Sequence, residues 1–387
     1  EAPLKALKWM FDKEAPRLFR PQLDGDQWRW GRKFLAQCND TAFERNVQQI
    51  VALGAYSHAA LKDLVASTGI EYNRLERGIA HFYTDQKSFD AAGHAVELMR
   101  KFGVQRRLVS RDELLKIEPA FKAYGDKITG GTYTSTDESG DARVFTQELA
   151  RRCAARGAQF LYGHDVLRLN KIGDAIDSVA VIARNTGAGG QKDFILKADA
   201  FVVACGSYSA PLLRTVGVDL PIYPGKGYSA TFPLLRPEGA PMVSTIDDGK
   251  KIAMSRLGNV LRVAGTIELG GFDMSLDSPV ARARCHMLSR RIAEILPGVC
   301  DTRTPEEGGN PQYGTGLRPA TPTNIPFIAQ TRVGKLWVNA GHGTLGWTHG
   351  AGSGKAMAEL LSGEVPAMNF GFLGVQAPRA VRGTVAA

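Results

Sequence analysis

The chain of 387 residues lacks the cysteine and histidine patterns of disulfide-rich or metal-binding proteins. Its five cysteines are far apart, form no CxxC pair and are odd in number, which excludes a complete disulfide framework and favours a reducing compartment such as the cytoplasm. Its seven histidines form no HExxH or similar paired spacing, so we expect no metal. The cysteines are Cys38, Cys153, Cys205, Cys285 and Cys300.

Long apolar runs are also missing. No uninterrupted apolar stretch is long enough to cross a bilayer, and the first residues, 1–5, do not have the basic-then-apolar order of a secretory signal. The hydrophobic fraction of 44% and the charged fraction of 22% are ordinary for a globular protein. The length is sufficient for two domains with a large core.

Acidic residues are fewer than basic ones, 39 against 48, which gives a net charge of +9 and a pI near 9.3. A dispersed basic surface explains this balance most simply. The alternative is attraction to anionic lipid, to an anionic substrate or to nucleic acid. No nucleic-acid-binding motif is present, so we expect no nucleic-acid partner and keep open a peripheral position on the inner face of the plasma membrane.

The periodicity of apolar residues predicts an alternation of helices and strands. A short apolar run over 200–206 is typical of a strand buried in a parallel sheet, and three alternating segments before it predict an antiparallel meander. The fold class is therefore α/β with a mixed α+β character: a cofactor domain interleaved with an antiparallel β-rich domain. We expect helices over 43–67, 88–102, 111–115, 144–156 and 280–296, strands over 77–83, 128–134, 159–162, 166–169, 178–183, 194–197 and several between 223 and 267, and a loop over 308–326.

The most informative segment is Gly341–Lys355, which follows the apolar run 335–340 and precedes the apolar segment 356–361. The order predicts strand, glycine loop and helix, an arrangement that binds phosphate-bearing cofactors through free N–H groups at a helix start. The spacing does not match a nucleoside-triphosphate loop, because His349 stands where the first glycine is required and Ala356 follows the lysine. The alternative is a glycine-rich helix packed closely on a strand.

Three weaker motifs precede this segment. A strand ending in Ala204-Cys205-Gly206 is common beside dinucleotides, although a buried strand with a turn glycine is as probable. Arg318, held in a proline-flanked loop, could grip a carboxylate through two parallel hydrogen bonds, and the alternative is a surface ion pair. The segment Ile222–Tyr228 could line a pocket or serve only aromatic packing.

In this order the motifs resemble those of the flavin-dependent D-amino-acid oxidoreductases, and most closely the family of the D-amino-acid dehydrogenase small subunit. Gly316-Leu317-Arg318-Pro319 with Pro322 and Pro326-Phe327-Ile328 is similar to the family's GLRP…TPIVG segment. Gly341–Trp347 is similar to its GHGTLGWT segment, and Tyr223–Tyr228 to its YPxKGY segment. The resemblance extends over nearly all of residues 1–366.

The resemblance implies an FAD-dependent enzyme that removes a hydride from the α-carbon of a D-amino acid such as D-alanine, forms a 2-oxo acid and ammonia, and passes electrons to a quinone or respiratory-chain acceptor. It implies that Arg318 binds the substrate carboxylate, with Tyr228 and Tyr313 as further pocket candidates. Alternatives are a glycine- or sarcosine-type amine oxidase of the same fold, or a catalytically inactive truncated fragment. The implied FAD contacts are Val166, Ala204, Gly206, Gly341, His342, Gly343, Thr344, Leu345 and Gly346.

The resemblance also leads us to expect a strand–GxGxxG–helix unit before Leu4–Met10, and hence before Glu1. It predicts a flavin-binding domain from residues 141–220 and 310–366, without this N-terminal portion. It predicts a substrate-binding domain from residues 40–140 and 221–309. Residues 367–387 are expected to form a loosely ordered tail.

Overall fold

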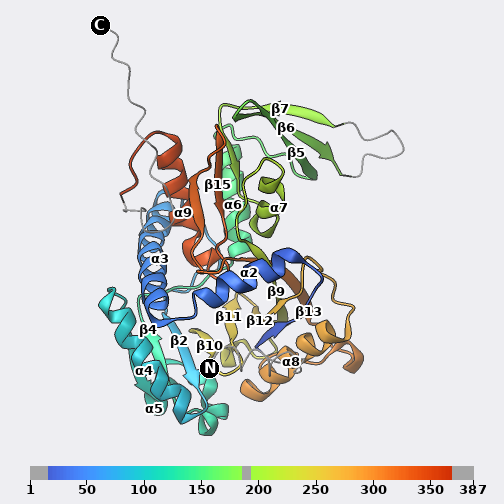
Figure 1. Ribbon diagram of the computed structural model, residues 1–387. Helices are drawn as coiled ribbons and strands as arrows, with labels where there is room; N and C mark the ends of the chain where they lie inside the picture. Colours follow the sequence, from blue (N-terminus) through green and yellow to red (C-terminus); the bar gives the residue numbers. More distant parts are fainter. Residues whose placement is uncertain (1–15, 185–192, 368–387) are drawn as a thin grey trace. The chain divides into compact units, whose positions relative to one another are not determined.

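The computed structural model describes residues 16–184 and 193–367 and divides the chain into two compact units (Figure 1). Unit 1 consists of Glu1–Leu23, Ile70–Leu149 and Pro224–Leu317, and unit 2 of the three segments between and after them, Asp24–Gly69, Ala150–Tyr223 and Arg318–Ala387. The expected segments Leu4–Met10 and 368–387 lie outside the described residues. Each unit therefore combines segments that are distant in the sequence.

Unit 1 is built on a mixed nine-stranded sheet in the order β13-β9-β12-β11-β10-β2-β4-β3, with β1 paired to β12. The β1–β12 and β10–β2 pairs are parallel, and the pairs β10–β11, β11–β12, β12–β9, β2–β4 and β3–β4 are antiparallel. The strands are β1 Arg17–Phe19, β2 Ile79–Tyr83, β3 Arg106–Ser110, β4 Gly130–Thr134, β9 Tyr223–Pro233, β10 Ser244–Asp247, β11 Ile252–Leu257, β12 Val260–Leu269 and β13 Gln312–Ala320.

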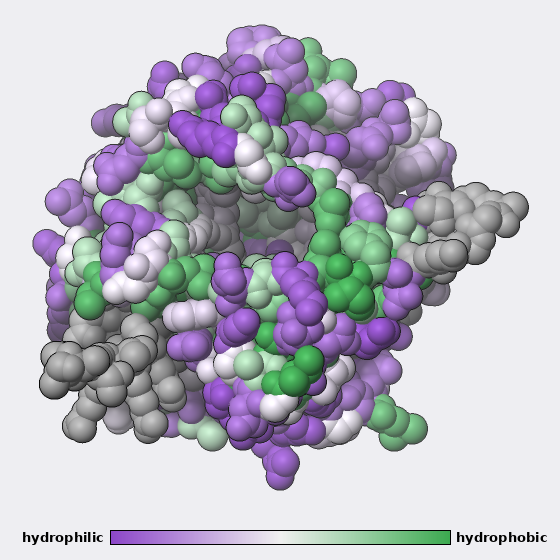
Figure 2. All heavy atoms as spheres, turned by 90° about the horizontal axis from the view of Figure 1, so that it is seen from above, coloured by the Kyte–Doolittle hydropathy of each residue, from purple (hydrophilic) through white to green (hydrophobic). Residues whose placement is uncertain are grey.

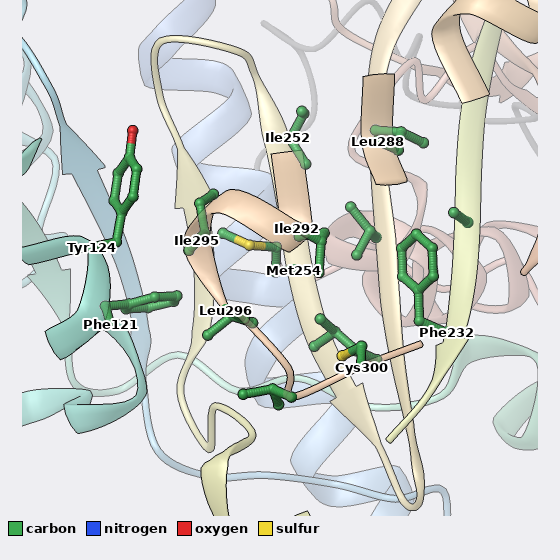
Figure 3. Packing of buried hydrophobic residues seen from close by; sticks show 14 of the residues in the cluster. Phe121, Tyr124, Phe232, Ile252, Met254, Leu288, Ile292, Ile295, Leu296 and Cys300 are labelled. Carbon is green, nitrogen blue, oxygen red and sulfur yellow. The ribbon is translucent and has the colours of Figure 1, made fainter. Parts of the chain in front are cut away.

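One face of this sheet forms the main core of unit 1 (Figure 3). Helix α8 (Pro279–Ile295) begins at Ser278, whose side chain accepts the N–H of Ala281, and a proline occupies its first turn. Its apolar side packs Leu288 and Ile292 against Met254 of β11 and Phe232 of β9, all nearly inaccessible. Burial of this cluster is the principal stabilising contribution to unit 1.

Helix α4 (Gln86–Lys101) packs against the end of the sheet formed by β2, β4 and β3. Phe89 of α4 contacts Tyr83 of β2 with ring centroids 6.0 Å apart. A Cβ added at Gly130 of β4 would lie 2.6 Å from the Phe89 ring, so any side chain at this position would displace that ring. Short helices complete the unit: α5 Arg111–Ile117, η1 Pro119–Lys127, η3 Pro237–Gly239 and η4 Pro305–Glu307, and α6 Ala142–Ala154 leads into unit 2.

Unit 2 contains two three-stranded sheets and several helices. The first sheet has the order β14-β15-β8, in which β15 is parallel to β8, and the second is the antiparallel meander β5-β6-β7. The strands are β5 His164–Ile172, β6 Ala175–Ala183, β7 Phe194–Lys197, β8 Phe201–Val203, β14 Phe327–Gln330 and β15 Leu336–Ala340; the helices are α2 Gly25–Ala36, α3 Asp40–Thr68, η2 Gly206–Tyr208, α7 Ser209–Arg214 and α9 Gly346–Leu361.

The two long helices of unit 2, α3 and α9, pack along each other (Figure 1). Gly352 of α9 lies against Ser57 of α3: its N–H donates to the Ser57 hydroxyl at 3.0 Å, and a Cβ added there would lie 2.7 Å from Ser57 Cα. Further along, the Tyr56 hydroxyl donates to the Glu359 carboxylate at 2.9 Å. The glycine therefore permits a close backbone approach between the helices.

Most expected elements are confirmed within a few residues, and three are wrong. Residues 312–320 form strand β13 rather than a loop, because an edge strand tolerates glycine and proline. Residues 159–162 are not a strand, and Phe160, Leu161 and Tyr162 are exposed. Most of the glycine stretch, from Gly346 onward, is helical rather than loop, since packing along α3 stabilises α9 in spite of its glycines.

The division into units also differs from the expected domain boundaries. Helix α3 was expected in the substrate-binding domain, but it packs on α9 and belongs to unit 2. Residues 310–317 and most of α6 belong to unit 1. The assignment of one domain to flavin and the other to substrate stays a prediction.

Candidate functional site

A cavity of about 280 Å³ lies in unit 2 where strand β15 leads into helix α9. Small residues dominate its wall, so backbone atoms are close to its interior. The space-filling view in Figure 2 shows a hollow in the protein surface with hydrophobic and hydrophilic residues at its rim. The residues that line the cavity are Ala204, Gly206, Pro319, Asn339, Ala340, His342, Gly343, Gly346, Gly350 and Ser353.

The turn between β15 and α9 depends on glycines with different roles. Gly341 has a φ of 90° and turns inward, where an added Cβ would lie 2.7 Å from Thr321 Cγ2. Gly343 has a φ of 55° and lines the cavity, and an added Cβ would meet no atom within 4 Å. Its N–H donates to the Pro319 carbonyl at 2.9 Å, which fixes the turn against the end of β13.

The N-terminus of α9 is directed to this cavity. Gly346, Gly350 and Ser353 line it and lie at the 3–4-residue spacing of one helix face. The N-cap residue, Leu345, has no side-chain oxygen, so no capping hydrogen bond satisfies the first N–H groups. The positive end of the helix dipole therefore favours a negatively charged or electron-rich ligand group in the cavity.

Polar side chains from β15, the turn and α9 meet at the wall. His342 Nε2 is 2.9 Å from the hydroxyl of the buried Ser353, and burial lowers the pKa of His342 to about 4, so its ring is neutral near pH 7. The Asn339 amide donates to the Ser353 carbonyl at 3.4 Å. The buried Oδ1 of Asn339 has no hydrogen-bond partner among the residues that the structure describes, although buried polar atoms are normally satisfied.

Arg318 lies on β13 immediately before the cavity-lining Pro319. It is half-buried, and burial lowers the pKa of its guanidinium. The guanidinium nevertheless remains charged at any physiological pH. Arg318 itself is not among the residues that line the cavity, but its fork of N–H donors suits recognition of a carboxylate.

The structure brings together about half of the residues expected to contact a cofactor. Five of them line the cavity: Ala204, Gly206, His342, Gly343 and Gly346. Thr344 and Leu345 are in the same turn but not in its wall, Gly341 faces inward, and Val166 is exposed on β5. Their contacts with a cofactor stay predictions.

Sequence reasoning missed five wall residues: Pro319, Asn339, Ala340, Gly350 and Ser353. The last two could have been found from the helix period, since they follow Gly346 at positions 4 and 7. Asn339 was placed within an expected apolar strand, where a polar residue is a signal in itself.

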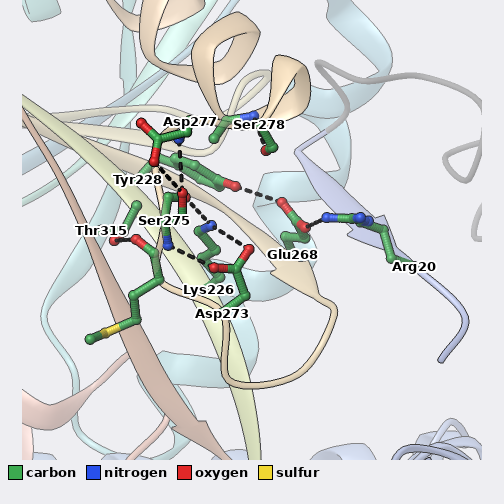
Figure 4. Close-up of polar contacts among 11 residues, drawn as sticks. Arg20, Lys226, Tyr228, Glu268, Asp273, Ser275, Asp277, Ser278 and Thr315 are labelled. Atoms are coloured by element: carbon green, nitrogen blue, oxygen red, sulfur yellow. Dashed lines mark hydrogen bonds and ion pairs between the residues drawn. The ribbon is translucent and has the colours of Figure 1, made fainter. Parts of the chain in front are cut away.

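The two tyrosines named from sequence are embedded in unit 1. Tyr228 of β9 is only 1% exposed, and its hydroxyl donates to the buried Glu268 carboxylate at 2.6 Å (Figure 4). Glu268 also accepts from Arg20 at 2.8 Å. The Tyr313 hydroxyl is 2.7 Å from Ser289 Oγ on α8. Both tyrosines thus lie on the sheet face covered by α8, and a role against substrate stays a prediction.

Sequence comparison gives a consistent set of relatives. The profile of the FAD dependent oxidoreductase family matches residues 15–360. The chain is 45% identical over 369 residues to a D-amino acid dehydrogenase of Dechloromonas aromatica, covering 95% of this chain and 85% of that protein. It is 39% identical to a D-amino acid dehydrogenase of Cereibacter sphaeroides over 374 residues, covering 97% of this chain and 81% of that protein.

Solved structures with similar folds are more distant in sequence. Glycine oxidase from Geobacillus kaustophilus superposes with a TM-score of 0.70 at 22% identity, covering 85% of this chain and 83% of that one. L-proline dehydrogenase from P. horikoshii superposes with a TM-score of 0.67 at 18% identity, covering 90% and 88%. At these identities the similarity shows the fold alone.

Proposed function

The chain belongs to the family of FAD-dependent oxidoreductases, and from this premise we propose that it oxidises D-amino acids such as D-alanine to 2-oxo acids and ammonia. The observation that carries the proposal is 45% identity over nearly the whole chain to a D-amino acid dehydrogenase. The fold similarity to glycine oxidase is too distant in sequence to favour glycine as the substrate.

The described residues of unit 2 fit part of FAD. The cavity, about 280 Å³, is just below the roughly 300–1,000 Å³ of pockets for drug-sized ligands, so it can enclose only a portion of a dinucleotide. Cβ atoms added at Gly206, Gly343 or Gly350 would meet nothing within 4 Å. At Gly206 and Gly343 the positive φ already favours glycine, but at Gly350 neither the backbone nor the protein's own packing requires it, whereas a ligand lying against the backbone would. The orphaned Asn339 Oδ1 supplies an acceptor for a ligand N–H group.

Bound FAD supplies the two-electron acceptor for oxidation of the substrate's Cα–N bond. The protein's task is then to orient the substrate. Arg318 holds the α-carboxylate by charge-assisted hydrogen bonds and so fixes the direction of the Cα–H bond. The neutral His342 and Ser353 form a rigid polar wall, and the α9 N-terminus stabilises negative charge that develops on the ligand.

We further propose that electrons pass to a quinone-type acceptor at the membrane surface. The excess of basic residues, a net +9, supports attraction to an anionic bilayer. None of the helices in residues 16–184 and 193–367 has the length and apolar character needed to span a membrane. Sedimentation with vesicles of anionic lipid at low salt, reversed at high salt, tests this part of the proposal; protein that stays in the supernatant contradicts it.

Anaerobic mixing of the purified yellow protein with D-alanine tests the activity. We expect loss of the flavin's visible absorbance with D-alanine and none with L-alanine, with pyruvate and ammonia as products. A protein that releases flavin on denaturation but is bleached by neither enantiomer contradicts the proposal.

An Arg318→Ala variant tests the carboxylate contact. Removing a charged hydrogen-bonding partner costs about 2–5 kcal/mol, so kcat/KM for D-alanine should fall by at least about 30-fold while flavin content is retained. Arg332→Ala is the matched control, because this exposed arginine lies in the turn between β14 and β15 and donates to the Gly217 carbonyl. Unchanged kinetics in Arg318→Ala would remove Arg318 from the site.

A further inference from the structure

A second groove, of about 630 Å³, lies in unit 1 at the edge of the nine-stranded sheet. It is formed by the edge strand β3, the turn before it, the end of α4 and the turn after β4. Apolar and polar residues share its wall, a composition typical of small-molecule sites. Its lining residues include Val96, Arg100, Val104, Arg106, Leu108 and Ser135.

One of the charged residues that line this groove is Arg106, the first residue of β3. Its Nε donates to the hydroxyl of the buried Thr132 on β4 at 3.1 Å, and its Nη1 contacts the Met99 sulfur of α4 at 3.5 Å. These two contacts fix the guanidinium between the sheet and α4. A thioether is a weak acceptor, so the charge itself is not neutralised by either contact.

The other charged residues of the groove are already paired. Arg100 donates to Glu97 at 3.0 Å, and Arg107 pairs with Glu113 of α5. Arg106 makes no ion pair with any carboxylate of the described residues. The charges of Asp137 and Asp248 act on it only from a distance, and burial still lowers its pKa. Among the charged residues that line the groove, Arg106 is therefore the one whose positive charge is not paired with a carboxylate of the described residues.

Keeping a half-buried guanidinium without a carboxylate is costly, and proteins normally pair such a group. An anionic ligand would remove this cost. Val96, Val104 and Leu108 add apolar surface beside the charge, and Leu108 is 44% exposed although it is large and apolar. We propose that this groove binds a small organic carboxylate, with Arg106 on the carboxylate and an apolar portion of the ligand against these three residues.

Ligand-observed NMR with isobutyrate as the probe tests the site in the intact, flavin-loaded protein. We expect isobutyrate to bind the wild type, and isobutyramide, its neutral isostere, to bind at least about tenfold more weakly, because the hydrogen bonds to charge are lost. Arg106→Gln should weaken isobutyrate binding by a similar factor. Arg107→Gln is the matched control, since this exposed neighbour is already paired with Glu113 and should bind like the wild type.

Two further variants separate this site from the proposed substrate site and from an effect of misfolding. Arg318→Gln removes the carboxylate site proposed for the substrate, and the binding that depends on Arg106 should persist in it. Ser135→Trp introduces a large side chain at an exposed residue of the groove wall while Arg106 is retained, and should abolish that binding even if Arg106→Gln folds poorly. Binding that is equal in the wild type, Arg106→Gln and Ser135→Trp, or that disappears in Arg318→Gln, overturns the proposal without affecting the proposed oxidation of D-amino acids.

Discussion

Two groups of buried polar side chains, the network around Glu268 in unit 1 and the cavity wall in unit 2, differ in whether the fold satisfies them. In unit 1, Glu268 accepts from both Tyr228 and Arg20, and the buried Lys226 donates to the Ser275 carbonyl at 2.5 Å (Figure 4). In unit 2, Asn339 Oδ1 has no hydrogen-bond partner, and neither have the ring nitrogens of the 1%-exposed His349, among the residues described.

The difference separates polar groups that serve the fold from those that are available to a ligand. Burying a polar atom without a partner costs free energy, so a closed network such as that around Glu268 stabilises one arrangement of unit 1. The unsatisfied Asn339 lies in the wall of the cavity, where a ligand can supply the missing partner. His349 is different again, because it points toward α3, its Nε2 being 4.0 Å from a Cβ placed on Gly54.

The largest expected effect comes from breaking the closed network. Glu268→Ala leaves the buried Tyr228 hydroxyl without its acceptor and removes an ion-pair partner of the partly exposed Arg20, so the free energy of unfolding should fall by about 3 kcal/mol. Urea denaturation measures it. Glu113→Ala, at an exposed ion pair, should change it by less than about 1 kcal/mol. Equal losses in both variants would mean that the network contributes nothing beyond a surface pair.

The next effect concerns His349 and pH. Burial lowers its pKa from 6.5 to about 4, with a smaller contribution in the same direction from His342. Because the folded-state pKa is the lower one, the unfolded chain binds the proton first. The stability that neutral His349 confers is complete above pH 6.5 and is lost as the pH falls toward 4, by up to about 3 kcal/mol.

His349→Leu removes this titration. Denaturation curves between pH 7 and 4 should therefore show a smaller loss of stability in the variant than in the wild type. His342 and His81 titrate in the same direction and remain in both proteins, and Asp248, with its pKa lowered to about 2, titrates below this range. Parallel curves for the two proteins would show that His349 is protonated as easily in the fold as in the unfolded chain.

A third effect tests the close approach of α3 and α9. Gly352→Ala places a Cβ 2.7 Å from Ser57 Cα, and relieving this overlap should cost about 1–3 kcal/mol, more than alanine gains by helix propensity. Gly354→Ala is the control two residues further on, where an added Cβ meets nothing within 4 Å. Thermal unfolding should show a lower Tm for the first variant and a Tm that is equal or higher for the second.

The sequence predicted the elements that local patterns determine. The helix expected over 43–67 is α3, and the strand, turn and helix around the cavity were expected from apolar runs and glycine chemistry. The family resemblance placed Gly343 and Gly346 at the site, and both line the cavity. Such features depend on residues that are neighbours in the chain.

Features set by long-range contacts could not be predicted. Whether Tyr228 faces α8 or the opposite side of its strand depends on pairing with β12, and the sequence of β9 alone does not reveal it. Gly350 of α9 faces the cavity and Gly352 faces α3, and both roles depend on elements that are distant in the sequence. The unpaired charge of Arg106 is likewise visible only once its neighbours in space are known.

The smallest expected effect concerns Gly350 and Gly354 of α9, whose alanine variants should change the free energy of unfolding equally. Cβ atoms at Gly350 and Gly354 both meet nothing within 4 Å, so either alanine variant should raise the free energy of unfolding by roughly 0.5–1 kcal/mol through helix propensity. Only Gly350 lines the cavity. If the space beside it belongs to flavin, Gly350→Ala should weaken FAD binding several-fold, measured by flavin fluorescence titration, while Gly354→Ala leaves it unchanged. Equal flavin affinity in the two variants would mean that the ligand does not approach this face of α9, and that the open space at Gly350 is no more than solvent-filled surface.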